Sequence, residues 1–422
     1  YIVTDPRHTT PRASHPALQP IADALAADRR DFDRHEACFF EIGAESGHLL
    51  TAFLHRTVRG QGAGGLRFWT YDTVEALIRD GLRLAKGMGQ KNALAGLWWG
   101  GGKGVIARRA DVDHRAPDVR AAVYRDYGRF VTGLRGCYIT AEDVGTTPAD
   151  MAWIFRTTRH ATCIPPTVGG SGNPSRLTAI GVVMAMEAAL EHTGQATEPG
   201  RALAGKTVAM QGLGNVASFM LDTLFERGVA KVVATDLDAD SVARATARFG
   251  DRIDARVQTR DDRAIFATRC DILAPNAVGG VLDPETIPML LSPIVCGAAN
   301  NQLADPSRDA ELLKQRGILY VPDFLANRMG IVNCANEQYG VFDDDPVITA
   351  HLDREQPTGV FRRCLEVFER ATHRDSTPAE EASKLADELS DEPHPLWGHR
   401  GWQIITHLID AGWDRQPAVP AD

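Results

Sequence analysis

The second half of the chain alternates short apolar runs with amphipathic segments. The apolar runs predict strands at residues 206–210, 231–235, 271–274, 294–296 and 318–321, and the amphipathic segments predict helices at 216–227 and 240–249. Apolar runs without polar alternation are typical of strands buried on both faces, and their alternation with helices is typical of a parallel sheet. We therefore expect a doubly wound α/β domain in this half.

The first half of the chain has a mixed pattern. Apolar runs at 38–42 and 49–54 flank a glycine-containing polar segment, which predicts a hairpin. The elements expected after it are a capped amphipathic helix from 72 to about 88, a helix at 117–132, a short strand at 138–140, a glycine-rich linker at 169–174 and a helix at 177–192. These elements predict a second α/β unit.

The length of 422 residues exceeds what one hydrophobic core usually holds, so two domains are expected. Residues 1–20 are rich in Pro, His and Thr, and the pattern beyond Gly340 becomes helical and charged. The expected division is an N-terminal arm at 1–20, a first domain at 21–168, a second domain at 169–335 and a helical segment at 336–422 that packs on the first domain.

Composition and charge exclude several classes of protein. The net charge of -9 argues against a nucleic-acid or anionic-membrane partner, and no apolar run approaches the length of a membrane span. The start of the chain lacks a basic segment followed by an apolar one, so we expect a cytoplasmic protein. The seven cysteines are dispersed without CxxC spacing, which predicts buried thiols, and the histidines show no ligand spacing, so no metal is expected.

Two lysines and an aspartate are the first candidates for chemistry. Lys103 directly follows three glycines, where the backbone can approach a ligand closely. Lys91 lies twelve residues earlier, and a second cation nearby favours the neutral, basic form of a lysine. Asp143 follows the short strand and could exchange protons with the same site.

A glycine motif in the second half predicts a dinucleotide site. Gly212 and Gly214 open a GxGxxA sequence between a strand and a helix, so that Asn215 and Val216 begin that helix. The next strand ends at Asp236, whose carboxylate could accept hydrogen bonds from a ribose. Because a carboxylate there would repel the extra phosphate of NADP, the motif predicts NAD.

Seven motifs occur in the order found in one known family. The motifs are Gly64-Gly65-Leu66-Arg67-Phe68, Met88-Gly89-Gln90-Lys91-Asn92-Ala93, Gly100-Gly101-Gly102-Lys103, Thr140-Ala141-Glu142-Asp143-Val144-Gly145-Thr146-Thr147, Gly170-Ser171-Gly172-Asn173-Pro174-Ser175, Gly212-Leu213-Gly214-Asn215-Val216-Ala217 and Gly297-Ala298-Ala299-Asn300-Asn301-Gln302-Leu303. By these motifs the chain resembles the Glu/Leu/Phe/Val dehydrogenases, most closely leucine and phenylalanine dehydrogenase.

The resemblance implies a reaction, an assembly and a role for each motif. The family deaminates L-amino acids oxidatively to 2-oxo acids with a nicotinamide cofactor, and its members form symmetric oligomers. The first domain would then bind substrate and form the oligomer, and the second would be a Rossmann-type NAD domain. Lys91 would hold the substrate carboxylate, Lys103 would act as the base that activates water, and Asp143 would move protons at the amino group. Further contacts are implied for Gly64, Gly65 and Asn327 with substrate, and for Thr178, Asn276 and Asn300 with the cofactor.

The side-chain pocket implied by the resemblance is apolar. It would be lined by Ala63, Ala141, Ile331 and Cys334. Glutamate-specific members carry a lysine and a serine where this chain has Ala63 and Cys334, so a distal carboxylate would be buried without a partner. We expect an apolar or aromatic amino acid as substrate.

Two other functions stay open at the level of sequence. One is an NAD-binding regulatory protein that kept the fold without the activity, and the other is a biosynthetic enzyme that works reductively on an unusual 2-oxo acid. Because a binding module has no need of Lys91, Lys103 and Asp143 together, the dehydrogenase interpretation is preferred.

Overall fold

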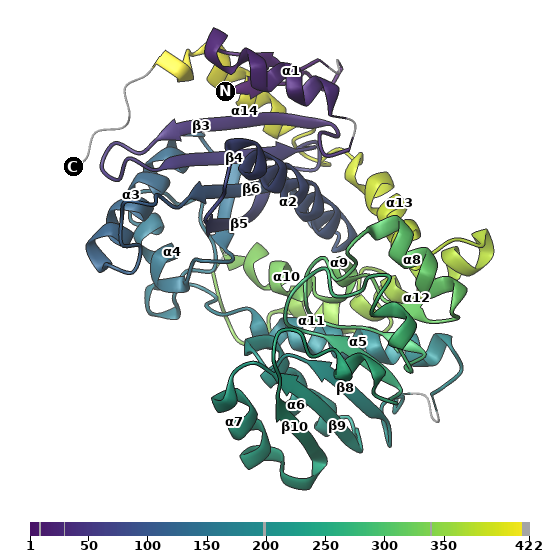
Figure 1. Ribbon diagram of the computed structural model, residues 1–422. Helices are drawn as coiled ribbons and strands as arrows, with labels where there is room; N and C mark the ends of the chain where they lie inside the picture. The colour runs from purple at the N-terminus through teal and green to yellow at the C-terminus, as the bar shows by residue number, and fades with distance from the viewer. Residues whose placement is uncertain (8–9, 29, 197–199, 338–339, 416–422) are drawn as a thin grey trace. The chain divides into compact units, whose positions relative to one another are not determined.

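Two compact units make up the fold. A computed structural model describes residues 1–7, 10–28, 30–196, 200–337 and 340–415 (Figure 1). The first unit comprises Tyr1–Asn173, Cys334–Phe342 and Ala386–Asp422, and the second comprises Pro174–Asn333 and Asp343–Leu385.

The first unit contains a seven-stranded mixed sheet. Its strand order is β2 (Arg12–Ala13), β1 (Ile2–Val3), β3 (His35–Ile42), β4 (Leu49–His55), β6 (Gly100–Ala107), β5 (Gly62–Trp69) and β7 (Tyr138–Glu142). The hairpin predicted from the apolar runs is confirmed as the antiparallel pair β3 and β4. Strand β5 runs parallel to both β6 and β7, so these three strands bring their carboxyl ends to one edge.

Helices complete the first unit. They are α1 (Gln19–Ala27), α2 (Val74–Leu94), α3 (Pro117–Gly133), α4 (Pro148–Phe155) and α14 (Arg400–Asp410). Helix α2 is capped by the Thr73 hydroxyl, which accepts from the Ala76 amide, and it packs against β4 and β6. It continues past residue 88, where the pattern predicted its end, and so includes Lys91.

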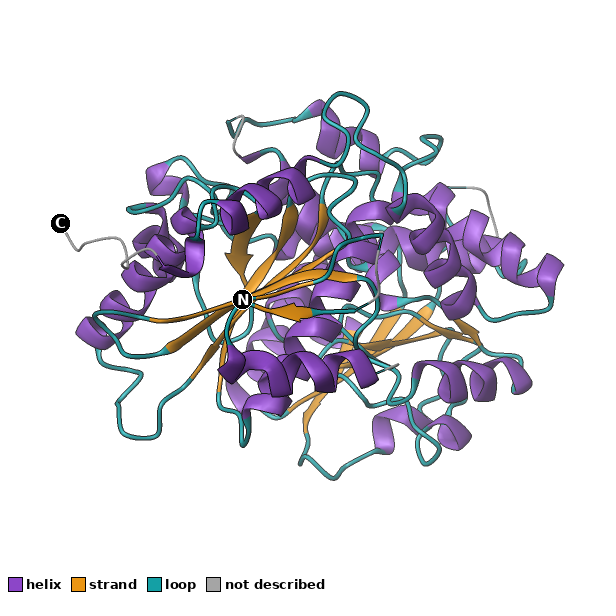
Figure 2. Ribbon diagram, turned by 90° about the horizontal axis from the view of Figure 1, so that it is seen from above, coloured by secondary structure: helices purple, strands orange, loops and turns teal. Residues whose placement is uncertain are grey.

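The second unit contains a six-stranded parallel sheet. Its order is β10 (Ile253–Val257), β9 (Lys231–Asp236), β8 (Thr207–Gln211), β11 (Ile272–Pro275), β12 (Ile294–Val295) and β13 (Leu319–Tyr320). Its helices are α5 (Ser175–His192), α6 (Asn215–Glu226), α7 (Ala239–Phe249), α8 (Pro306–Gln315), α9 (Asp323–Ala326), α11 (Pro346–Leu352) and α12 (Val360–Arg374). Figure 2 shows the strands of each unit flanked by helices. The doubly wound α/β prediction is confirmed.

The C-terminal part of the chain is divided between the units. Residues 386–422 belong to the first unit, but residues 343–385 belong to the second, which differs from the expected return of all of 336–422 to the first domain. The apolar face of α12 packs against α5, where the rings of Phe368 and His192 lie 5.2 Å apart. Helices α10 (Met329–Ala335) and α13 (Pro378–Ser390) each contain a point where the chain passes from the second unit to the first.

The glycines before Lys103 lie in a strand and not in a turn. Gly100, Gly101 and Gly102 form the first half of β6. A Cβ atom on Gly102 would lie 2.7 Å from the backbone carbon of Gly62, and one on Gly64 would lie still closer to the backbone oxygen of Gly102. These glycines therefore let β5 and β6 pack backbone against backbone.

All seven cysteines lie in the described part of the chain, where each is a buried thiol outside any disulfide, as the sequence predicted. Within the same residues, no helix has the length and apolar character that crossing a bilayer requires.

Candidate active site

Three neighbouring strands assemble the catalytic candidates in the first unit. Lys103 lies in β6, Arg67 in β5, and Asp143 directly after β7. The Lys103 ammonium donates to Oδ2 of Asp143 at 2.7 Å, and Nε of Arg67 donates to the same oxygen at 3.3 Å. The structure thus brings together the predicted pair, Lys103 and Asp143, and adds an arginine.

The backbone of Asp143 is fixed by a threonine. The Asp143 amide donates to the Thr146 hydroxyl at 2.8 Å, and that hydroxyl donates to the carbonyls of Asp143 and Leu66 at 2.7 and 3.2 Å. Leu66 belongs to β5, so the turn that carries Asp143 is tied to the strand that carries Arg67. The carboxylate is therefore presented by a rigid turn.

The sequence prediction missed a second carboxylate that orients Arg67. Nη1 of Arg67 donates to both oxygens of Asp80 at 3.1 and 3.0 Å, and the Tyr71 hydroxyl donates to Asp80 at 2.5 Å. Arg67 was already part of the Gly64–Phe68 motif, and its place two residues after Gly65 puts both on one face of β5. The alternation of side chains along β5 is therefore the sequence signal that could have identified Arg67 as a site residue.

Burial and charge set the protonation of the pair. Lys103 is 3% exposed, and burial lowers the pKa of its ammonium, with Arg67 lowering it further against the opposing effect of Asp143. Arg67 is thus a cation beside Lys103 that lowers its pKa, a role that the sequence had suggested for Lys91. Burial alone would raise the pKa of Asp143, but Lys103 and Arg67 outweigh burial and hold it at about 2.

The predicted substrate contacts of the first unit lie around the same strands. Lys91 is in the last turn of α2 and partly buried. The neighbouring Asn92 amide donates to the carbonyls of Ala63 and Gly100 at 3.3 and 2.8 Å, which holds the end of α2 against β5 and β6. A Cβ atom on Gly65 would lie 2.7 Å from Cβ of Asp143.

The predicted pocket residues of the first unit are buried and apolar. Ala63 is 1% exposed, and Ala141 and Cys334 belong to one small cluster with Cys163. Ile331 and Asn327 lie in the second unit. Sequence reasoning did not identify Cys163 as part of this cluster.

The glycine turn of the second unit has the geometry of a dinucleotide cradle. Gly212 adopts a left-handed φ of 97°, and its amide donates to Thr235 O at 2.7 Å. Gly214 is the N-cap of α6, and a Cβ atom there would meet nothing within 4 Å. Asn215 and Val216 form the first turn of α6, whose backbone amides can receive an anion.

Asp236 borders this turn. Its Oδ2 accepts from the Leu213 amide at 2.6 Å, and its Oδ1 accepts from the Asp238 amide at 2.8 Å. Asp238 itself is the N-cap of α7. The acidic residue that selects the cofactor in the sequence prediction is therefore held beside the glycines.

The predicted asparagines of the second unit form one network. Oδ1 of Asn276 accepts from the Ala298 amide at 2.8 Å, and the Asn327 amide donates to Ala298 O at 3.1 Å and to Oδ1 of Asn300 at 2.8 Å. Nδ2 of Asn276 and Oδ1 of Asn327 are buried without a hydrogen-bond partner among the described residues. Such orphaned polar atoms fit a cofactor that carries amide and hydroxyl groups.

Thr178, another predicted cofactor contact, lies on α5. Its hydroxyl donates to Pro174 O at 3.0 Å, and a Cβ atom on Gly330 would lie 2.9 Å from it.

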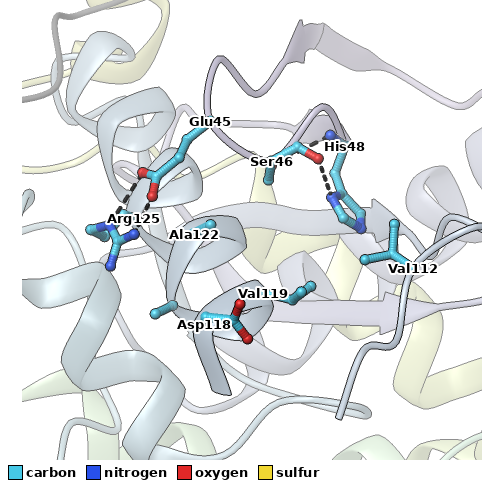
Figure 3. A pocket seen from close by; sticks show the side chains of 9 residues that line it. Glu45, Ser46, His48, Val112, Asp118, Val119, Ala122 and Arg125 are labelled. Carbon is cyan, nitrogen blue, oxygen red and sulfur yellow. Dashed lines mark hydrogen bonds and ion pairs between the residues drawn. The ribbon is translucent and has the colours of Figure 1, made fainter. Parts of the chain in front are cut away.

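Two cavities lie away from these residues. One, of about 480 Å³, opens in the first unit beside His48, Asp118 and the Glu45–Arg125 ion pair (Figure 3). Another, of about 340 Å³, lies between α5 and α6 in the second unit. Neither is lined by a predicted site residue.

Comparison with known proteins identifies the class and then the family. The first unit carries a buried lysine hydrogen-bonded to a half-buried aspartate, and the second carries a glycine turn beside an acidic strand end, which is typical of a dinucleotide-dependent dehydrogenase. A sequence profile for the Glu/Leu/Phe/Val dehydrogenase dimerisation domain matches residues 36–160, and the Glutamate/Leucine/Phenylalanine/Valine dehydrogenase profile matches residues 169–387. The chain belongs to this family of amino acid dehydrogenases, which act on CH–NH2 groups with a nicotinamide cofactor.

Relatives with assigned activities cover most of the chain. It is 42% identical to leucine dehydrogenase of Geobacillus stearothermophilus, over 72% of this chain and 79% of the relative. It is 38% identical to valine dehydrogenase of Streptomyces virginiae, over 85% and 94%. The crystal structure of L-tryptophan dehydrogenase from Nostoc punctiforme is similar with a TM-score of 0.69 and 30% identity, over 89% of this chain and 98% of that one.

Proposed function

We propose that the protein catalyses NAD-dependent, reversible oxidative deamination of an apolar or aromatic L-amino acid. Amino acid, NAD⁺ and water give 2-oxo acid, ammonium, NADH and a proton. The observation that carries the proposal is the hydrogen bond of 2.7 Å from the buried Lys103 to the half-buried Asp143 in a member of this family.

Three residues of the first unit are proposed to have chemical roles in this reaction. Lys91 binds the substrate α-carboxylate through a charge-assisted hydrogen bond. A bound nicotinamide would supply the acceptor for the hydride of the substrate α-carbon. Lys103, in its neutral form, removes a proton from the water that attacks the resulting iminium, and Asp143 receives and returns protons at the amino nitrogen. The lowered pKa of Lys103 supports its role because it raises the neutral fraction at a given pH.

The second unit is proposed to hold the cofactor. The Gly212–Val216 turn would bind the pyrophosphate, Asp236 the adenosine ribose, and Thr178, Asn276 and Asn300 the nicotinamide end. The position of the Asp236 carboxylate beside the turn supports NAD over NADP, because a 2′-phosphate there would face a negative charge.

An apolar substrate side chain is supported by the proposed pocket. Ala63, Ala141 and Cys334, the proposed pocket residues of the first unit, are buried and carry no charge. A buried, unpaired carboxylate costs several kcal/mol, which disfavours glutamate. The activities of the leucine, valine and tryptophan dehydrogenases to which this chain is similar agree with that choice.

We also propose that the protein forms a homo-oligomer. The profile that matches residues 36–160 describes a dimerisation domain, and a symmetric assembly is the usual outcome for such a unit.

The proposed substrate class is tested by NADH formation at alkaline pH with leucine, valine, phenylalanine, tryptophan and glutamate. The expected result is turnover with at least one apolar or aromatic amino acid and a kcat/KM for glutamate at least about 100-fold lower. A preference for glutamate would contradict the proposed pocket, and binding of NAD without turnover in either direction would favour the regulatory alternative.

A further inference from the structure

Two buried cysteines of the first unit lie in contact. The Sγ atoms of Cys163 and Cys334 are 2.7 Å apart, and each residue is 2% exposed. A disulfide bond is about 2.05 Å long, so the sulfurs need to approach by only about 0.6 Å. Both side chains share a small apolar cluster with Ala141.

The backbone of Cys163 is held in an unusual conformation. Its φ is 60°, in the left-handed region that favours glycine. The buried Glu337 carboxylate accepts from the amides of Cys163 and Ile164 at 2.8 and 3.1 Å and from the Ser171 hydroxyl. A strained conformation over-determined by its surroundings is a reason to look for function, and here it presents one thiol to another.

We propose that Cys163 and Cys334 are a redox modification site that closes to a reversible disulfide when the protein meets a peroxide. One thiol is first oxidised by hydrogen peroxide to a sulfenic acid with release of water. The sulfur of the second cysteine then attacks the sulfenic sulfur, a second water leaves, and the S–S bond forms. A dithiol reductant restores both thiols.

The position of the pair gives the disulfide a consequence for activity. Cys334 is the first residue after the chain passes back from the second unit, and Cys163 lies ten residues before the first passage, at Asn173. The disulfide would join the segment that precedes Asn173 to the segment that begins at Cys334. It would also change the shape of the substrate pocket proposed around Ala141 and Cys334. The loss of activity rests on the proposed function, whereas the formation of the bond does not.

The reduced thiols are stable until an oxidant arrives. The hydrogen bond with Cys163, together with burial, raises the pKa of the Cys334 thiol well above its ordinary value. Because the thiolate is the reactive form, the pair should react with peroxide more slowly than an exposed cysteine.

The test treats the intact, reduced protein with hydrogen peroxide, blocks the remaining thiols with N-ethylmaleimide and maps tryptic peptides without reductant. Cleavage at arginine gives peptides 160–176 and 329–354, each with one cysteine. The expected product is the linked pair, two hydrogens lighter than the sum, which dithiothreitol separates. Turnover is expected to fall about tenfold or more as the link forms, and to recover with dithiothreitol.

Two variants serve as controls. Cys163→Gly removes one sulfur and suits the left-handed φ, so it should fold, form no link and lose the reversible inhibition relative to its own reduced form. Cys270→Ala removes a buried thiol of the second unit and should behave as the parent does.

Absence of the 160–176 to 329–354 link after peroxide treatment would overturn the proposal. A link that leaves turnover unchanged would overturn its regulatory part. A link in protein that shows no turnover before oxidation would contradict the proposed dehydrogenase function and still establish the disulfide.

Discussion

Arg67 is the residue on which the charge balance of the candidate site depends. It contacts Asp143 and Asp80, and its charge helps to lower the pKa of both Lys103 and Asp143. Arg67 acts through Lys103 and Asp143 and is therefore a positioning residue. The sequence motif contained Arg67, but its contact with Asp143 depends on how β5 and β7 pair.

Arg67→Gln is expected to move the rising limb of the pH profile of kcat/KM to higher pH. The reason is that removal of the cation raises the pKa of Lys103, so that its neutral form appears only at higher pH. The measurement is the pH dependence of amino acid oxidation. Arg83→Gln removes an arginine of α2 that pairs with Asp31 and should leave the limb in place. A limb that stays or moves to lower pH in Arg67→Gln would contradict the assignment.

Asp236→Ser is expected to lower the preference for NAD over NADP. Loss of the carboxylate removes its repulsion of the 2′-phosphate, and the ratio of the two kcat/KM values should fall about tenfold or more. Asp238→Ser is the matched control. Serine preserves the N-cap of α7, and the substitution removes a nearby negative charge while the hydrogen bond between Asp236 and the glycine turn stays in place. Equal effects of the two substitutions would show that Asp236 has no special role.

Among the elements, the order of strands and helices was predictable from the hydrophobic pattern, while the strand of Gly100, Gly101 and Gly102 was not. Glycine has no side chain to show periodicity, so the pattern gave no sign that three glycines in a row begin a strand. The structure shows that these glycines let the backbones of β5 and β6 lie close together, which depends on both strands. Pairing between distant segments is what a single-chain pattern does not contain.

The packing of Arg328 and Met329 is likewise a property of segments far apart in the sequence. Arg328 is fully buried and donates to the carbonyl of Thr358, and Met329 packs against Gly181 of α5. Both residues thus serve packing inside the second unit. Burial lowers the pKa of Arg328 to about 9.

Gly181→Ala is expected to lower the melting temperature. Its Cβ would lie 2.6 Å from Cγ of Met329, and overpacking of this kind costs about 1–3 kcal/mol, more than alanine gains in a helix. Gly87→Ala, in α2, meets nothing within 4 Å and should raise the melting temperature. The two melting curves, measured side by side, would contradict this packing account if both substitutions stabilised the protein.

At the scale of the whole molecule, the two-unit architecture followed from length and from the change in pattern, but the path of the C-terminal segment did not. Helix α12 is amphipathic, and its apolar face has to be buried somewhere. The sequence does not say on which unit, because both offer apolar surfaces. The structure shows it on α5, whose buried residues include Val182, Met186 and Leu190.

The central claim is that Lys103, paired with Asp143, performs the proton chemistry of deamination. The most direct test compares kcat for amino acid oxidation in the parent protein and in Lys103→Ala, with NADH binding followed by fluorescence. Loss of a general base predicts a fall in kcat of about 10²–10⁴-fold with an unchanged Kd for NADH. Turnover close to that of the parent protein in Lys103→Ala would contradict the claim.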